Sequence, residues 1–193
     1  MVRRARIGNE LSKAWTQTVR RYGNREIASE RNLQACLFSD LSAELGANRR
    51  IFVEPTIVLP SGAKIIPDMV ICNTREVICF LELKFSPRGK PDRIKDMRSI
   101  SSVAGSNDIK IRLRRYRGPG PSSIEVAVAK AVLFAWAGIH ARSTTDSEVW
   151  TEPAFRTHPH IELHALTGKE QLPVVSYNVR GLRIKTGSAI ARK

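Results

Sequence analysis

Cysteine is scarce in this chain, and its pattern excludes two kinds of site. The three cysteines are Cys36, Cys72 and Cys79, an odd number without a Cys-x-x-Cys pair. A disulfide framework or a thiolate zinc site requires a different pattern. We therefore predict three reduced cysteines that serve in packing.

Long hydrophobic runs are also missing. The longest apolar stretch, 126–139, is interrupted by Lys130 and is shorter than the roughly 20 residues of a bilayer-spanning helix. The first residues, Met-Val-Arg-Arg, lead into polar residues and not into an apolar segment, which argues against a secretory signal. We expect a cytoplasmic protein that does not enter a membrane.

Acidic residues are few relative to basic ones. The chain has 32 lysines and arginines against 18 acids, which gives a formal net charge of +14. A surplus of this size attracts polyanions and speeds encounter with them. We predict nucleic acid as the partner, although a basic surface without such a partner explains the charge alone equally well. The length of 193 residues predicts a single domain over 1–193.

Two helices are predicted at the start of the chain. The first extends from an N-cap at Asn9 to Tyr22, because the Asn side chain can accept from a free backbone amide. The second extends from the 24–29 region to Leu45, where leucine recurs at every fourth position and Gly46 follows as a C-cap.

The pattern then changes to period two or to continuous apolar runs. It predicts strands over 51–59, 65–72 and 77–83, a helix over 91–103 and a long buried strand over 124–136. Weaker signals favour strands at 149–150 and 161–166, and the end from Val179 to Lys193 is basic and is expected to fray.

The informative stretch is IIPDMVICNTREVICFLELKF, residues 65–85, in which charged groups interrupt apolar strands. Glu82 and Lys84 are expected on one face because side chains alternate along a strand. If residue 73 lies opposite residue 77 across the turn, the same register places Asp68 opposite Glu82. Two adjacent carboxylates repel each other and require a cation, and hard oxygen ligands select magnesium or manganese.

An acid is also predicted on the apolar stripe of the second helix. Helical spacing places Glu30 on the same side as Leu33, Leu37 and Leu41. An acid there is unusual and makes Glu30 a candidate for the same site. A favourable interaction of a first-turn acid with the helix dipole is the alternative.

These residues resemble the motif of the PD-(D/E)xK nuclease superfamily. The matching positions are Pro67-Asp68, then Glu82-Leu83-Lys84, preceded by the helical Glu30. The resemblance implies an α/β fold with a restriction-endonuclease-like αβββαβ core, in which helices flank a mixed central sheet. The core covers about 24–139, and 140–193 is an extension that completes the sheet and ends in a basic tail.

The resemblance also implies a metal-dependent nuclease that hydrolyses phosphodiester bonds in DNA, as an endonuclease. Asp68 and Glu82 then bind Mg²⁺, for which Mn²⁺ can substitute, together with the backbone carbonyl of Leu83. Glu30 is an outer or second ligand, and Lys84 orients or activates the attacking water and stabilises negative charge. RNA as substrate is left open, and so is a homodimer or larger complex.

Three rival hypotheses account for the motif without catalysis. A salt-bridge network at the end of a hairpin, without function, accounts for the same charges, although surface ion pairs contribute little and rarely require acids within apolar runs. A non-catalytic nucleic-acid-binding module on the same fold is the rival function. A structural subunit of a larger assembly is the third.

Basic residues provide candidate contacts to nucleic acid. The segment IKIRLRRYR, 109–117, alternates apolar and basic residues, so that one face packs and the other is cationic. A solvated edge strand protected by charge is the alternative. The candidates are Lys90, Arg93, Lys110, Arg112, Arg114, Arg115, Tyr116 and Arg117.

Two further groups are weaker candidates. His158, His160 and His164 could bind a transition metal, but no carboxylate or cysteine completes the set at a familiar spacing. Glu54 could line the cleft, although the following Pro55 favours an edge or a bulge.

Overall fold

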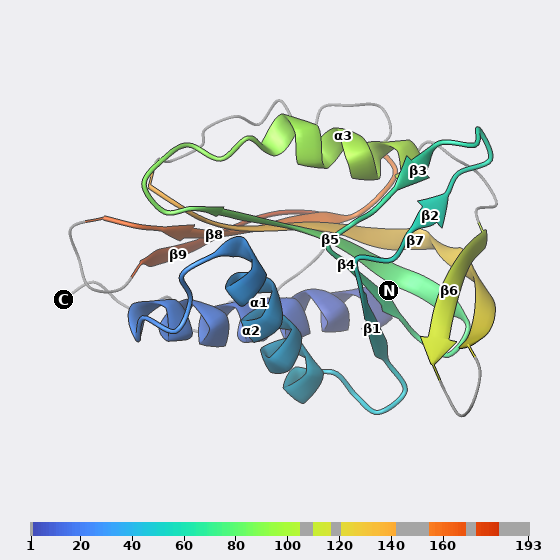
Figure 1. The fold of residues 1–193 in the computed structure, drawn as a ribbon, viewed down its shortest axis with the longest axis horizontal. Coiled ribbons are helices and arrows are strands. Elements are labelled where there is room, and N and C mark those ends of the chain that lie inside the picture. Colours follow the sequence, from blue (N-terminus) through green and yellow to red (C-terminus); the bar gives the residue numbers. More distant parts are fainter. Residues whose placement is uncertain (1, 105–109, 117–120, 142–154, 169–172, 182–193) are drawn as a thin grey trace.

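A mixed β-sheet with helices on both faces forms the protein, as a computed structural model shows (Figure 1). The structure describes residues 2–104, 110–116, 121–141, 155–168 and 173–181. Helices α1 and α2 cover one face of the sheet and α3 lies over the other. The helices are α1 Val2–Gly23, α2 Glu30–Glu44 and α3 Arg93–Ala104. The strands are β1 Arg50–Val53, β2 Ile57–Val58, β3 Lys64–Ile65, β4 Met69–Cys72, β5 Glu76–Ser86, β6 Lys110–Tyr116, β7 Pro121–His140, β8 His160–Leu166 and β9 Val174–Arg180.

The main sheet has the strand order β1-β4-β5-β7-β8-β9, and β6 pairs with β7. The pairs β1–β4, β4–β5, β6–β7 and β8–β9 are antiparallel, whereas β5–β7 and β7–β8 are parallel. Strands β2 and β3 form a separate two-stranded sheet. The prediction of a mixed central sheet flanked by helices is therefore confirmed.

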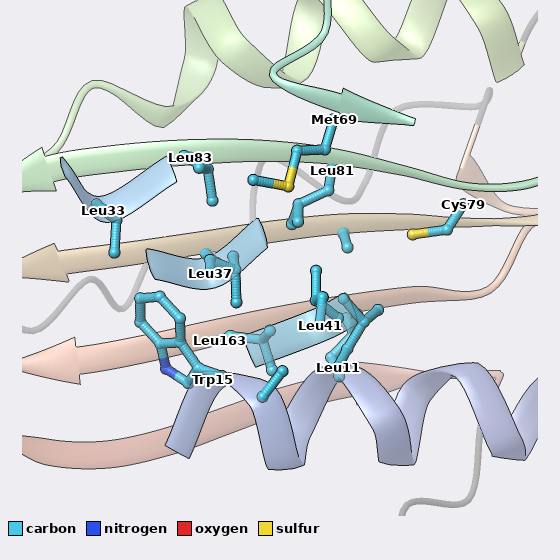
Figure 2. Packing of buried hydrophobic residues seen from close by; sticks show 14 of the residues in the cluster. Leu11, Trp15, Leu33, Leu37, Leu41, Met69, Cys79, Leu81, Leu83 and Leu163 are labelled. Carbon is cyan, nitrogen blue, oxygen red and sulfur yellow. The ribbon is translucent and has the colours of Figure 1, made fainter. Parts of the chain in front are cut away.

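Alternation along β5 divides its side chains between the two faces. Leu81 and Leu83 join the core under α1 and α2, whereas Phe80 joins the core that contains Trp136 and the buried side of α3. Figure 2 shows Leu33, Leu37 and Leu41 of α2 packed toward the strands, with Leu11 and Trp15 of α1 beside them. Glu82 and Lys84 share the parity of Phe80 and so belong to the α3 face.

The helix boundaries differ from those predicted. Helix α1 begins at Val2, so Asn9 lies within it and is not its N-cap. The N-cap of α2 is Ser29, whose hydroxyl accepts from the Asn32 N–H. Helix α2 ends at a C-cap on Leu45 in extended conformation, so Gly46 does not provide the predicted left-handed cap.

The first two predicted strands are each broken in two. The run 51–59 becomes β1 and β2, interrupted where Glu54 adopts a φ of 47° before Pro55. The run 65–72 becomes the end of β3 and β4, interrupted at Pro67, which has no N–H to donate to a ladder. In place of two long strands, β1 and β4 therefore pair at one edge of the main sheet, and β2 and β3 form a small hairpin.

The predicted pairing register is confirmed where it matters for the site. Met69 pairs with Leu81, Val70 with Phe80 and Ile71 with Cys79, the register that places Asp68 next to Glu82. The predicted turn pair is wrong by one residue, because a bulge shifts the ladder so that Cys72 pairs with Val77. The bulge absorbs the extra residue before it reaches the site.

The later elements largely follow the predictions. Helix α3 and strands β7 and β8 lie where periodicity placed them, with β7 extended to His140. Strand β9 was not predicted as such, and it covers the start of the segment expected to fray. Residues 149–150 and 182–193 lie outside the described residues.

Two expectations from composition can be compared with the structure. All three cysteines are free, as predicted, and Cys72 and Cys79 are buried. Within the described part of the chain, none of the helices combines the length and the apolar character needed to cross a bilayer.

Candidate active site

The candidate site lies where β5 extends past the end of β4. Strand β4 begins at Met69, which pairs with Leu81, whereas β5 continues to Ser86. Two carboxylates accept hydrogen bonds from backbone N–H groups on this part of β5. Asp68 Oδ2 accepts from the Leu83 N–H at 2.6 Å, and Glu30 Oε2 accepts from the Phe85 N–H at 3.0 Å. Acids from α2 and from the start of β4 therefore meet along one strand.

Asp68 and Glu82 form the acidic pair that the register predicted, with Glu82 buried and Asp68 partly buried. Burial, the Asp68 charge and the hydrogen bond that protonated Glu82 donates to Asp68 together raise the pKa of Glu82 to about 9, and burial is the largest of these causes. Burial also raises the pKa of Asp68, although the hydrogen bonds from Leu83 and Glu82 oppose this. The pair therefore holds a proton at neutral pH unless a cation replaces it.

Lys84 lies on the same face as Glu82 and pairs with an acid that sequence reasoning missed. Its Nζ is 3.8 Å from Oδ2 of Asp96, on the first turn of α3. The pKa of Asp96 is raised to about 6, because the effect of burial exceeds the lowering by the Lys84 charge. The lysine side chain is 27% exposed, so its ammonium group reaches both Asp96 and solvent.

Glu30 joins the site from the opposite layer. It is the first residue of α2, and it is exposed. Its hydrogen bond to Phe85 connects the helix start to β5. An acid at this position also interacts favourably with the helix dipole, so the structure is compatible both with a place in the site and with the dipole interaction.

The backbone of Asp68 is held by two further groups. Its carbonyl accepts from the Glu54 N–H at 3.0 Å and from Gln34 Nε2 at 3.3 Å. Gln34 lies one turn after Glu30 on α2 and also donates to Glu54 Oε1 at 3.4 Å. The Glu54 charge is among the groups that raise the pKa of Asp68. Gln34 was not predicted, whereas Glu54 lies beside the site at the end of β1, close to the predicted cleft position.

A buried polar network lies beneath the first turn of α3. Arg93 pairs with Glu162 Oε1 at 2.8 Å, and Glu162 Oε2 lies 3.1 Å from His164 Nε2. His164 Nδ1 lies 3.0 Å from His140 Nε2. The signal that pointed to Glu82, an acid inside an apolar strand, also marks Glu162.

This network corrects the expectation that Arg93 contacts nucleic acid. Its side chain is 3% exposed and faces Glu162 and the ring of Trp136, so it points into the protein and not toward a phosphate in solvent. His164, a member of the predicted histidine set, takes part in the same network through Glu162 and His140.

The described part of the basic segment, strand β6, lies away from the acids. Strand β6 pairs with the start of β7, level with Glu76 at the beginning of β5, and Figure 1 shows it at the opposite end of the sheet from the end of β5. Eight residues of strand separate Glu76 from Lys84, roughly 25 Å at about 3.3 Å per residue. Ile111 is buried and Arg112 exposed, which fits the predicted alternation.

The remaining basic candidates are described only in part. Lys90 is exposed, shortly before α3. The side chains of Lys110, Arg114, Arg115 and Tyr116, and the whole of Arg117, lie outside the described residues.

The donor chemistry of the site fits a hard divalent cation. Asp68 and Glu82 offer carboxylate oxygens, and the Leu83 carbonyl lies next in the chain; oxygen ligands of this kind suit Mg²⁺ or Mn²⁺. Among the described residues, no three His, Cys, Asp or Glu side chains are grouped as a ready-made ion site. Asp68 and Glu30 each accept a backbone N–H with one carboxylate oxygen, which leaves the other oxygen of each for a metal.

The fold is similar to that of solved structures of NucC. The cAAA-bound form from P. aeruginosa ATCC27853 aligns with a TM-score of 0.51 at 10% identity, over 89% of this chain and 82% of that chain. The apo form from E. coli MS115-1 aligns with a TM-score of 0.49 at 10% identity, over 86% and 81%. The first likeness shows the fold alone, and it is consistent with the predicted restriction-endonuclease-like class.

Comparison of the sequence gives no further assignment. No known protein family and no curated protein matches the chain. The chemistry of the site therefore has to be argued from its own residues.

Proposed function

We propose that this protein is a metal-dependent nuclease that hydrolyses phosphodiester bonds in DNA, as an endonuclease. The observation that carries the proposal is the convergence of Asp68, Glu82 and Lys84 at the end of β5. The fold similarity to NucC supports the same class of fold. A salt-bridge network alone gives no reason for a buried Glu82 beside Asp68, because two carboxyl groups do not form an ion pair with each other and can both be ionised only next to a cation.

Asp68, Glu82 and the Leu83 carbonyl are the proposed ligands of Mg²⁺ or Mn²⁺, with Glu30 as an outer or second ligand. A bound divalent cation supplies Lewis-acid polarisation of the phosphate and a lower pKa for bound water. Asp68 and Glu82 give up their shared proton on binding it. The Leu83 carbonyl is fixed in direction because its residue is part of β5.

Lys84 has two proposed tasks. Its ammonium group stabilises the negative charge that develops on the phosphate oxygens during attack, and it orients the attacking water. The group remains close to the acids because Glu82 and Lys84 lie on one face of a rigid strand. Its partial exposure leaves it accessible to a substrate.

DNA is the proposed substrate because of the +14 net charge and the exposed Lys90 and Arg112. Lys90 lies between β5 and α3, close in sequence to the acids. Strand β6 provides a second cationic region, and the roughly 25 Å of strand between it and Lys84 corresponds to several base pairs of duplex.

The test is cleavage of supercoiled plasmid and of single-stranded DNA in Mg²⁺, Mn²⁺ or chelator. We expect metal-dependent cutting by the wild type and a loss of about 100- to 1000-fold or more in Lys84→Ala. Lys13→Ala is the matched control, because Lys13 is an exposed lysine on α1, on the other face of the sheet. Salt-sensitive DNA binding without cutting by any protein would instead support the non-catalytic binding module.

A further inference from the structure

Helix α3 is fixed to the sheet at its first residue. Arg93 pairs with Glu162 on β8, and both side chains are 3% exposed. Glu162 is in turn bonded to His164, and His164 to His140 on β7. The Arg93 guanidinium also lies over the Trp136 ring, 5.8 Å from its centroid. Ion pairs this deeply buried are costly to break on one side, so the first turn of α3 has a defined position.

Asp96 follows Arg93 by one helical turn and therefore lies on the same side of α3. That side faces the site: Asp96 Oδ2 is 3.8 Å from Lys84 Nζ, and the Asp96 side chain is 15% exposed. Among the described residues, Asp96 Oδ2 and Trp136 Nε1 are buried without a hydrogen bond of normal geometry. The Trp136 indole N–H nevertheless lies near enough to the Asp96 carboxylate to lower the pKa of Asp96. The indole thus limits where the carboxylate can lie.

Lys84 needs such a partner. A lysine has four rotatable side-chain bonds, and an ammonium group without a fixed partner samples many positions. The carboxylates of Asp68 and Glu30 are directed to backbone N–H groups of β5. Asp96 instead approaches Lys84 from helix α3. The position of the ammonium group is then set by β5 on one side and by α3 on the other.

We infer that Asp96 is a positioning residue for Lys84, and that the Arg93–Glu162 ion pair fixes Asp96 in place. The inference rests on the proposed nuclease function for its consequence in catalysis. Asp96 does not contact the reacting atoms in this arrangement. It acts through the ammonium group of Lys84.

The first experiment compares Asp96→Asn and Asp96→Glu with the wild type in steady-state DNA cleavage. Asp96→Asn should lower kcat by about 10- to 100-fold with little change in KM, because misplacement of a reacting group by about 1 Å has effects of this size. Asp96→Glu should recover part of kcat because it restores the charge. Asp92→Asn is the matched control: Asp92 is an exposed acid just before α3, and its variant should cleave like the wild type.

A second readout separates positioning from metal binding. Asp96→Asn should retain the rise in melting temperature that Mg²⁺ gives the wild type, because the proposed ligands are unchanged. Loss of that rise would make Asp96 a ligand and would overturn the inference. Unchanged kcat in Asp96→Asn would overturn it as well.

A third readout does not depend on activity. Unfolding midpoints in urea are compared for Lys84→Ala, Asp96→Asn and the double variant. Non-additive shifts show that the two side chains are coupled, and additive shifts refute the pairing. If no protein, including the wild type, cuts DNA, the proposed function fails, and the positioning of Lys84 by Asp96 is decided by this cycle alone.

Discussion

Replacing Glu82 with glutamine is expected to stabilise the protein at neutral pH and to abolish its activity. The pKa of Glu82 is raised from 4.5 to about 9, so at pH 7 the carboxyl is protonated when folded and ionised when unfolded. Because the pKa of Glu82 is higher in the folded state, its contribution to stability is fully present only below the unfolded-state pKa of about 4.5. This contribution is lost as the pH rises toward the folded-state pKa of about 9. Glutamine resembles the protonated form and does not titrate.

The size of the effect follows from the same pKa. Each pH unit between the two values changes stability by about 1.4 kcal/mol, so between pH 4.5 and pH 7 the wild type loses up to about 3 kcal/mol that Glu82→Gln retains. For a chain of this length about 1 kcal/mol corresponds to 2–4 °C in Tm. Glu82→Gln should therefore melt several degrees above the wild type at pH 7.

The assay is thermal melting of both proteins from pH 5 to pH 8 without metal. The difference in Tm should be small at pH 5 and should grow with pH. A difference that stays constant over this range, or a variant that melts lower throughout, would refute the reasoning. With Mg²⁺, the wild type should gain more stability at higher pH, because the ion replaces a proton, and the variant should gain little.

Glu162→Gln is the matched control for burial. Glu162 lies in the same row of the sheet as Glu82, since both pair with Trp136 of β7, and it is equally well buried, at 2% against 7% exposed. Its carboxylate faces Arg93, however. Loss of that charge removes the carboxylate that faces the buried guanidinium, so this variant should lose about 3–5 kcal/mol. The two buried glutamates are thus expected to respond in opposite directions.

Two packing predictions concern the layers that support the site. A Cβ on Gly138 would overlap the ring of Trp136, so Gly138→Ala should lower the free energy of unfolding in urea by about 1–3 kcal/mol. An unchanged unfolding midpoint would contradict the close packing. Leu37 of α2 is fully buried against the sheet, so Leu37→Ala should lower the free energy of unfolding by about 2–5 kcal/mol. Phe38→Ala is the control, because Phe38 is 39% exposed. A smaller loss of stability in Leu37→Ala than in Phe38→Ala would show that α2 does not pack as described.

The placement of Glu82 and Lys84 was predictable because it depends on local rules. Strand alternation puts both on one face, and the pairing of Val70 with Phe80 confirms the register that puts Asp68 beside Glu82. The bulge near the turn was not predictable from turn length. It left the register of the site unchanged because it lies between the turn and the site.

The part of the site that depends on α3 could not be read from the sequence. Asp96 resembles any first-turn acid on an amphipathic helix, and its approach to Lys84 depends on how α3 crosses the sheet. The burial of Arg93 likewise depends on Glu162, 69 positions later. Contacts between distant segments leave no local signal in the sequence. The break of the first strand did leave such a signal, because Pro55 favours an edge or a bulge.

The position of β7 has a consequence for synthesis of the chain. Every acid and the lysine of the proposed site lie within residues 30–96, yet the inner edge of β5 pairs with β7, which ends at His140. A nascent chain that stops after α3 carries all the motif residues on a strand with an unpaired edge, the kind of edge that associates with other chains. Parallel pairing of such distant segments is also slow. The ribosome therefore delivers the proposed catalytic groups well before the strand that orients them, and we expect the growing polypeptide to show no cleavage until β7 has been translated.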